Sequence, residues 1–167
     1  MGKNFRGSSA SEHAVDGSDV RLGIACARWN DAITSRLLRG ATERAAELGV
    51  GDDAVDVAWV PGAFELPLAA QAMARTGRYD AVVALGCVIR GDTAHFEYVA
   101  GPAATGIMDA QLDTGVPIIL GVLTTENRRQ ALVRSVVDGD VAGDNKGAEA
   151  VDTALEMVAL LRAVNAG

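Results

Sequence analysis

The order of segments along this chain predicts an α/β protein, a three-layer α/β/α sandwich around a four-stranded parallel sheet. Stretches with strand character alternate four times with stretches of helical apolar spacing, without an obvious internal repeat. The most hydrophobic run, residues 81–87, is continuously apolar, as expected of a parallel strand that helices cover on both faces. A chain of 167 residues, 49% of them apolar, can bury a sizeable core as one domain.

A polar arm at residues 1–19 precedes the predicted domain. The arm is rich in Ser, Gly and charged residues, so it buries too little apolar surface to fold alone. A neighbouring copy of the chain is one candidate for holding it. We therefore expect a single α/β domain that spans residues 20–167.

Composition excludes several classes of partner. The formal net charge of −7 argues against nucleic acid, because a phosphate-backbone binder needs a basic face. Cys26 and Cys87 fall in predicted strands, where buried reduced thiols are the simplest interpretation, and the two histidines lie far apart in sequence, so we expect no metal site. The sequence shows neither an apolar run of transmembrane length nor a hydrophobic signal segment near Met1, which favours a soluble, cytoplasmic protein without membrane contact.

The first predicted strand covers residues 20–27 and runs into Trp29 and Asn30. Asp31 is expected to cap the helix that follows. Apolar residues recur there at helical spacing, and Gly49 is expected to close the helix. These apolar residues are Ile33, Leu37, Leu38, Ala41, Ala45 and Leu48.

The next two strands frame a short helix. Residues 54–60 form the second predicted strand, which leads into a Pro-Gly-Ala-Phe-Glu turn at residues 61–65. A short apolar helix is expected at residues 66–75, before the third strand at residues 81–87.

A Gly-Asp-Thr turn at residues 91–93 follows the third strand and precedes a helix expected at residues 94–114. The first N–H groups of a helix are unpaired and carry a partial positive charge, so this turn is a candidate phosphate seat, with His95 one turn inside the helix. Taken alone, such a turn is more often a plain helix cap. An isolated histidine is likewise more often solvated than catalytic, although its pKa near neutrality suits proton transfer.

The last part of the chain repeats the alternation once more. Residues 116–123 are the fourth predicted strand, and residues 124–127 are expected to cap a helix that runs through Arg134. A Gly- and Asp-rich loop at residues 138–144 leads into the final helix at residues 146–164.

Unusual loops follow every predicted strand, at residues 29–30, 62–65, 88–95 and 124–127. Open parallel sheets bind ligands at the carboxyl edge of their strands, so we expect these loops to meet in one site. No Gly-x-Gly-x-x-Gly follows the first strand, and no Gly-Lys-Ser/Thr loop is present. A dinucleotide-binding protein or a nucleoside triphosphatase is therefore disfavoured.

Five segments, in order from residue 20 to about residue 164, carry a resemblance to the 6,7-dimethyl-8-ribityllumazine synthase family. They are Arg28-Trp29-Asn30, Pro61 to Pro67, Gly86 to Val99, Gly121 to Asn127 and Asn145-Lys146-Gly147. The resemblance implies a flavodoxin-like fold and a transferase of riboflavin biosynthesis. It would condense 5-amino-6-(D-ribitylamino)uracil with 3,4-dihydroxy-2-butanone 4-phosphate, releasing phosphate and water at the penultimate step, without metal or cofactor.

The resemblance also implies which residues hold the uracil substrate. Trp29 falls where the family places an aromatic ring that stacks on the pyrimidine, although a strand-end core position is the alternative. The backbone of three strand-end residues would pair with the pyrimidine edge, Glu65 would reach the ribityl hydroxyls, and Leu120 replaces a second aromatic ring of many members. The full set is Trp29, Ala63, Phe64, Glu65, Cys87, Val88, Ile89, Leu120 and, less securely, Lys146.

A second set of matched residues implies the phosphate contacts and the chemistry. Asp92 and Thr93 match the phosphate-binding turn, with the Asp92 carboxylate expected to point away from the anion. Arg134 matches a phosphate-binding arginine, expected on the face of its helix, and a guanidinium suits bidentate contact with phosphate. His95 is the candidate for proton transfer, and Arg134 would orient the phosphate as it leaves. Without the resemblance, Arg134 would be an ordinary solvated helix charge.

Two further implications concern assembly and alternatives. Family members form rings of five, with active sites between adjacent subunits, and some rings assemble into sixty-subunit shells. The stretch between Arg134 and Lys146 is longer here than the compact loop that accompanies shells, so we expect a free homopentamer. An archaeal-type riboflavin synthase, or a non-catalytic flavin or lumazine carrier on the same scaffold, remains an alternative function.

Overall fold

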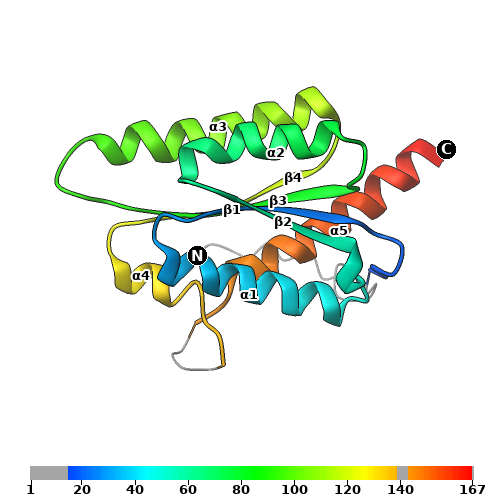
Figure 1. Cartoon of the computed structure of the whole chain (residues 1–167), viewed down its shortest axis with the longest axis horizontal. Coiled ribbons are helices and arrows are strands. Elements are labelled where there is room, and N and C mark those ends of the chain that lie inside the picture. Colours follow the sequence, from blue (N-terminus) through cyan, green and yellow to red (C-terminus); the bar gives the residue numbers. More distant parts are fainter. Residues whose placement is uncertain (1–14, 139–142, 167) are drawn as a thin grey trace, which may run out of the picture.

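A computed structural model describes residues 15–138 and 143–166 and confirms the predicted three-layer α/β/α fold (Figure 1). Its four strands are β1 (Leu22–Ala27), β2 (Val55–Val60), β3 (Ala81–Ile89) and β4 (Ile118–Thr125). They form one parallel sheet in the order β2-β1-β3-β4. The outer strands are therefore β2 and β4, and the described part of the chain pairs each of them on one side only.

Helices cover both faces of this sheet (Figure 1). One layer holds α2 (Leu66–Arg75) and α3 (His95–Thr114), and the other holds α1 (Asp31–Glu47), α4 (Arg128–Leu132) and α5 (Lys146–Ala166). Short 3-10 turns, η1 (Asp52–Ala54) and η2 (Ala63–Glu65), flank β2. None of the helices in the described ranges is both long and apolar enough to cross a membrane.

The two faces of the sheet bury two separate hydrophobic cores. Successive side chains of a strand point to opposite faces, so β1 places Leu22, Ile24 and Cys26 in the core beneath α1 and α5. Ala25 and Ala27 enter the core beneath α2 and α3. Every residue of β1 is buried, which explains why its sequence is apolar without alternation.

Residues just before β1 already lie against the domain, inside the segment predicted as the polar arm. The Gly17 N–H donates to the carbonyl of Leu48 at 2.8 Å, and Arg162 of α5 forms an ion pair with Asp19 at 3.0 Å. Residues 1–14 of that arm lie outside the described ranges.

Several predicted boundaries need correction. Asp31 is the first residue of α1, and its carboxylate accepts a hydrogen bond from the N–H of Ala32 at 2.8 Å, whereas Asn30 occupies the cap position. His95 begins α3 and does not lie one turn inside it. Residues 124 and 125 continue β4, because Thr124 and Thr125 pair with Val88 and Ile89 of β3.

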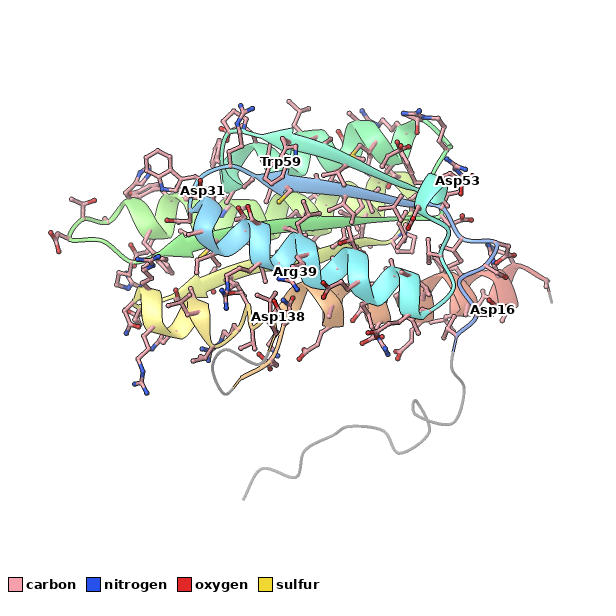
Figure 2. All side chains as sticks on the ribbon, turned by 60° about the horizontal axis from the view of Figure 1, so that its bottom comes forward. Asp16, Asp31, Arg39, Asp53, Trp59 and Asp138 are labelled. Carbon is pink, nitrogen blue, oxygen red and sulfur yellow. The ribbon has the colours of Figure 1, made fainter. Side chains whose placement is uncertain are left out.

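The helix expected to reach Arg134 ends at Leu132. Beyond α4, the chain pairs instead with the segment before α5, through an antiparallel bridge between Ser135 and Asn145. Asp138, at the end of this turn, has a left-handed φ of 57°, and Arg39 of α1 holds its carboxylate at 2.5 Å (Figure 2). Residues 139–142 of the predicted Gly- and Asp-rich loop are not described.

Candidate active site

The loops that follow β1, β2 and β3 meet at the carboxyl edge of the sheet and line a cavity of about 640 Å³. We call it the strand-end cavity. Nine of the predicted site residues border it: Trp29, Ala63, Phe64, Glu65, Cys87, Val88, Ile89, Thr93 and His95. Convergence of these three loops is what the strand order predicts, since β2, β1 and β3 are neighbours.

Trp29 stands at the mouth of the strand-end cavity with 74% of its surface exposed. Backbone bonds from Arg28 N to Val60 O, 2.8 Å, and from Trp29 N to Pro61 O, 3.0 Å, extend the pairing of β1 with β2 into the two loops. These bonds fix the backbone that presents the indole. Such exposure in the single chain excludes the interpretation of Trp29 as a core residue at the end of a strand.

Asn30 also borders the cavity, and the sequence analysis did not include it among the site residues. It adopts the left-handed conformation, φ 63° and ψ 44°, which Asn tolerates better than most residues. Its amide Nδ2 donates to the carbonyl of Cys87 at 2.8 Å. Asn30 therefore ties the loop after β1 to the end of β3, and the signal available in sequence was an Asn directly before a helix.

The turn after β2 supplies one wall of the cavity. Gly62 is fully extended, and the 3-10 turn η2 that follows buries Ala63 while leaving Phe64 58% exposed. Glu65 occupies the cap position of α2, where the dipole of the helix favours a carboxylate, and the helix starts with Pro67 in its first turn.

The end of β3 supplies the floor. The thiol of Cys87 is buried, and this burial raises its pKa to about 11, so the sulfur stays protonated at neutral pH. Only the backbone of this residue suits ligand contact. Its carbonyl already accepts the Asn30 bond, which leaves one further lone pair for another donor.

A turn and the start of α3 complete the cavity. Gly91, Thr93 and His95 border it and are exposed, and the His95 N–H donates to Thr93 Oγ1 at 3.4 Å. Asp92 is exposed as well but is not among the bordering residues. The start of α3, where the helix dipole favours an anion, lies beside an imidazole, a combination suited to anion binding and to proton transfer.

Arg90 holds the turn between β3 and α3 in place through its side-chain contacts. Its guanidinium lies 4.2 Å from the centroid of the Phe96 ring and pairs with Glu97 and, at 2.8 Å, with Glu126. Phe96 also borders the cavity, together with Tyr98 and Val99, which the sequence analysis quoted in a matching segment without giving them a role.

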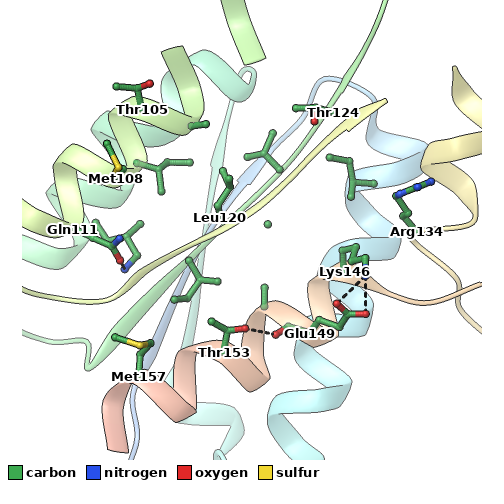
Figure 3. Close-up of a pocket in the computed structure, with 18 residues that line it drawn as sticks. Thr105, Met108, Gln111, Leu120, Thr124, Arg134, Lys146, Glu149, Thr153 and Met157 are labelled. Carbon is green, nitrogen blue, oxygen red and sulfur yellow. Dashed lines mark hydrogen bonds and ion pairs between the residues drawn. The ribbon is translucent and has the colours of Figure 1, made fainter. Parts of the chain in front are cut away.

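Three predicted residues line a different hollow. Leu120, Arg134 and Lys146 border a second cavity of about 920 Å³ between α3, β4 and α5, here called the edge cavity (Figure 3). Thr124 of β4 also lines it, and residues 125–127 border neither cavity. The loop after β4 therefore contacts the loop after β3, through the ion pair of Glu126 with Arg90, but does not line the strand-end cavity as expected. Among the described residues, none borders both cavities.

The edge cavity combines an apolar strand with two cations. Leu120 is 51% exposed on the outer strand β4. Arg134 lies in the turn beyond α4, not on the face of a helix, and its guanidinium donates to the carbonyl of Gln130 at 2.9 Å. Lys146 Nζ lies 2.8 Å from carboxylate oxygens of both Asp144 and Glu149, and these hydrogen bonds, Asp144 first, raise the pKa of the lysine.

The residues that the sequence predicts to bind substrate or to transfer protons are divided between the two cavities. Aromatic rings, strand-end backbone and a histidine surround the strand-end cavity, whereas the guanidinium and the ammonium group lie at the edge cavity. Within the described ranges, no group of three or more His, Cys, Asp or Glu side chains could hold a metal ion.

The family described as 6,7-dimethyl-8-ribityllumazine synthase matches residues 19–162 of this chain. The match runs from just before β1 into α5 and includes every residue that borders either cavity.

Proposed function

The chain belongs to the 6,7-dimethyl-8-ribityllumazine synthase family of riboflavin biosynthesis, and we propose that it condenses 5-amino-6-(D-ribitylamino)uracil with 3,4-dihydroxy-2-butanone 4-phosphate. The observation that carries this proposal is the division of the predicted residues. Seven of the nine residues matched to the uracil substrate border the strand-end cavity. The other two, Leu120 and Lys146, border the edge cavity together with the matched phosphate-binding arginine.

We infer that one copy of the chain supplies the strand-end cavity and its neighbour supplies the edge cavity. The outer strand β4 is open on one side in the single chain, and half of the Leu120 surface is exposed there. Placing this edge against a neighbour would bury apolar surface and would bring Arg134 and Lys146 to the mouth of the other cavity. A small-molecule site between subunits of a homopentamer is the result.

In the proposed mechanism, the pyrimidine stacks on Trp29 while strand-end backbone at Val88 and Ile89 pairs with its edge. Glu65 accepts hydrogen bonds from the ribityl hydroxyls. The N–H groups at the start of α3 and the neighbour's Arg134 hold the phosphate of the second substrate. Holding both substrates in one orientation converts a bimolecular condensation into an effectively unimolecular one.

The condensation then proceeds through imine formation, loss of phosphate and ring closure. The 5-amino group attacks the ketone and water leaves, which forms an imine. Loss of the proton on the neighbouring carbon then eliminates phosphate from the next carbon, and tautomerisation of the resulting enol leaves a carbonyl beside the imine. The ribitylamino nitrogen attacks the remaining carbonyl and a second condensation releases water as the ring closes. His95 transfers protons in these steps, and Arg134 stabilises the charge of the departing phosphate.

Mixing the pure protein with both substrates tests the proposal. We expect the lumazine chromophore and inorganic phosphate to appear together, well above the rate with heat-denatured protein. A carrier would bind a lumazine or flavin without forming the chromophore. A riboflavin synthase would instead consume added lumazine, so either result would contradict the proposal.

A further inference from the structure

Asn145, directly before α5, uses the hydrogen-bonding groups of its side chain in three directions. Its Nδ2 donates to the carbonyls of Arg36 in α1 and Val136 in the turn after α4, each at 3.0 Å. Its Oδ1 accepts from the N–H groups of Gly147 and Ala148 at 2.9 and 3.2 Å, which caps α5. One carboxamide thus connects α1, the turn after α4 and the start of α5.

Two glycines show how tightly this carboxamide is enclosed. A Cβ added to Gly40 of α1 would overlap the side chain of Asn145, and one added to Gly147 would overlap the carbonyl oxygen of Leu37. Gly40 of α1 therefore packs against the Asn145 carboxamide, and Gly147 of α5 packs against the backbone of Leu37. A half-buried side chain that makes four hydrogen bonds and packs against Gly40 is suited to fixing the backbone around it.

That backbone carries the two cations of the edge cavity. The Lys146 N–H donates to the carbonyl of Arg134 at 2.9 Å, and the neighbouring residues Ser135 and Asn145 form the antiparallel bridge. Arg36 secures the same turn from α1, because its Nε donates to the carbonyl of Ser135 at 2.9 Å. Arg134 lies in a turn and Lys146 at a helix start, so their relative placement depends on this tie.

We propose that Asn145 is a positioning residue that, through the bond between Lys146 N–H and the Arg134 carbonyl, holds Arg134 where it binds the phosphate-bearing substrate. The proposal rests on the function proposed above and assigns Asn145 no contact with substrate.

The variant Asn145→Asp isolates the role. Aspartate keeps the size of the side chain and the acceptor that caps α5, but it replaces the donating amide with an oxygen that faces two carbonyls. We expect the KM for the butanone phosphate to rise about tenfold or more in steady-state kinetics on the full-length assembled protein, with α5 retained. Asn165→Asp, at an exposed position late in α5, introduces the same charge and should leave the KM at the parent value.

A double-mutant cycle separates positioning from folding. If Asn145 acts through Arg134, Asn145→Asp should change the KM by less than about twofold in the Arg134→Ala background, because the group that it positions is gone. Equal effects on KM in both backgrounds would overturn the proposal. A kcat that falls by the same factor in both backgrounds, with the KM unchanged, would also overturn the proposal, because it indicates only that less of the enzyme is folded. Gly40→Ala should reproduce the kinetic effect of Asn145→Asp, since its methyl group displaces the carboxamide.

A measurement that needs no substrate keeps this inference separate from the proposed function. Amide hydrogen exchange of Lys146 reports its bond to the Arg134 carbonyl, and Asn145→Asp should speed this exchange about tenfold or more while Asn165→Asp does not. Parent-like exchange in Asn145→Asp would overturn the tie even in an active enzyme. If the parent protein does not catalyse the condensation but the two variants still differ in exchange, the proposed function is refuted. The role of the Lys146–Arg134 backbone bond in substrate binding is then refuted with it.

Discussion

Exposed aromatic side chains distinguish this chain at the scale of single residues. Trp29 and Phe64 border the strand-end cavity and are 74% and 58% exposed, although aromatic residues make up only 4% of the sequence. Rings of this size are usually buried when they serve stability alone. Their exposure at one cavity therefore supports a role in binding a flat ligand.

The substitution Trp29→Ala tests that role. In the proposed site, Leu120 takes the place of the family's second aromatic ring and the pyrimidine would stack on Trp29 alone. Removal of the indole should therefore weaken uracil-substrate binding by about 1 to 3 kcal/mol. Calorimetric titration measures the affinity. Unchanged affinity in a correctly folded variant would show that Trp29 does not contact the substrate.

Replacing His95 and replacing Arg134 should change the kinetic constants in different ways. His95→Ala should lower kcat by roughly 10- to 1000-fold with little change in the KM for the phosphate substrate, because proton transfer acts in the transition state and substrate alignment is retained. Arg134→Ala should raise that KM, since a charge-assisted contact with phosphate contributes about 1.5 to 3 kcal/mol, and should also lower kcat if the contact steadies the leaving group.

Steady-state kinetics on the two variants, with circular dichroism as a control for folding, decides both roles. A parent-like kcat for His95→Ala would remove the histidine from proton transfer. A parent-like KM for Arg134→Ala would remove the guanidinium from the phosphate site.

At the scale of elements, sequence patterns predict a boundary well where the stop signal is local. The predicted helix at residues 66–75 coincides with α2, because Pro67 marks its first turn and Gly77, with a left-handed φ of 68°, lies just beyond its end. The strands β3 and β4 extend two residues beyond their apolar runs. Their last residues pair with each other, and such pairing leaves no trace in the local pattern.

Predictions of helix ends fail where segments distant in sequence form hydrogen bonds with the backbone groups that would continue the helix. The capping residues at 124–127 predict a helix through Arg134, but Asp144 N donates to the Val133 carbonyl at 3.0 Å and Lys146 N to the Arg134 carbonyl. These bonds replace further helical turns after Leu132. Local propensity cannot show such a competition, since it depends on residues about ten positions later.

The close approach of α1 and α5 gives a prediction at this scale. Replacing a helical glycine with alanine usually stabilises a protein by about 0.5 to 1 kcal/mol. Gly147→Ala should instead destabilise it by about 1 to 3 kcal/mol, because the new methyl group overlaps the Leu37 carbonyl oxygen. Urea unfolding at a fixed protein concentration measures the difference, with Ala159→Gly at an exposed site of α5 as the control for helix propensity. A midpoint at or above that of the parent would mean that the helices separate without cost.

At the scale of the whole molecule, the sequence predicts candidate site residues but not their division between two cavities of the fold. The strand-end rule places all four loops together, whereas the fold leaves β4 at the outside of the sheet and directs Leu120 and Thr124 to the edge cavity. The strand-end rule considers only the strands of a single chain. Which residues a neighbour supplies depends on surfaces that a linear pattern does not describe.

We expect the protein to be a homopentamer that does not assemble into shells. Large apolar side chains are exposed on the helix and strand that border the edge cavity, including Met108, Leu112 and Leu120 at 49%, 73% and 51%, and contact with a neighbour would remove them from water. Light scattering should report a mass five times that of the chain. A monomer or a sixty-subunit mass would contradict this expectation.

The separation of the two cavities also has a genetic consequence. If each working site takes one cavity from each of two copies, His95→Ala and Arg134→Ala damage different halves, and subunits of both kinds can complement each other. Random co-assembly of equal amounts should restore full activity at about a quarter of the sites, those that join two intact halves. Neither variant alone would reach this level, and two defective alleles expressed together would rescue growth without riboflavin.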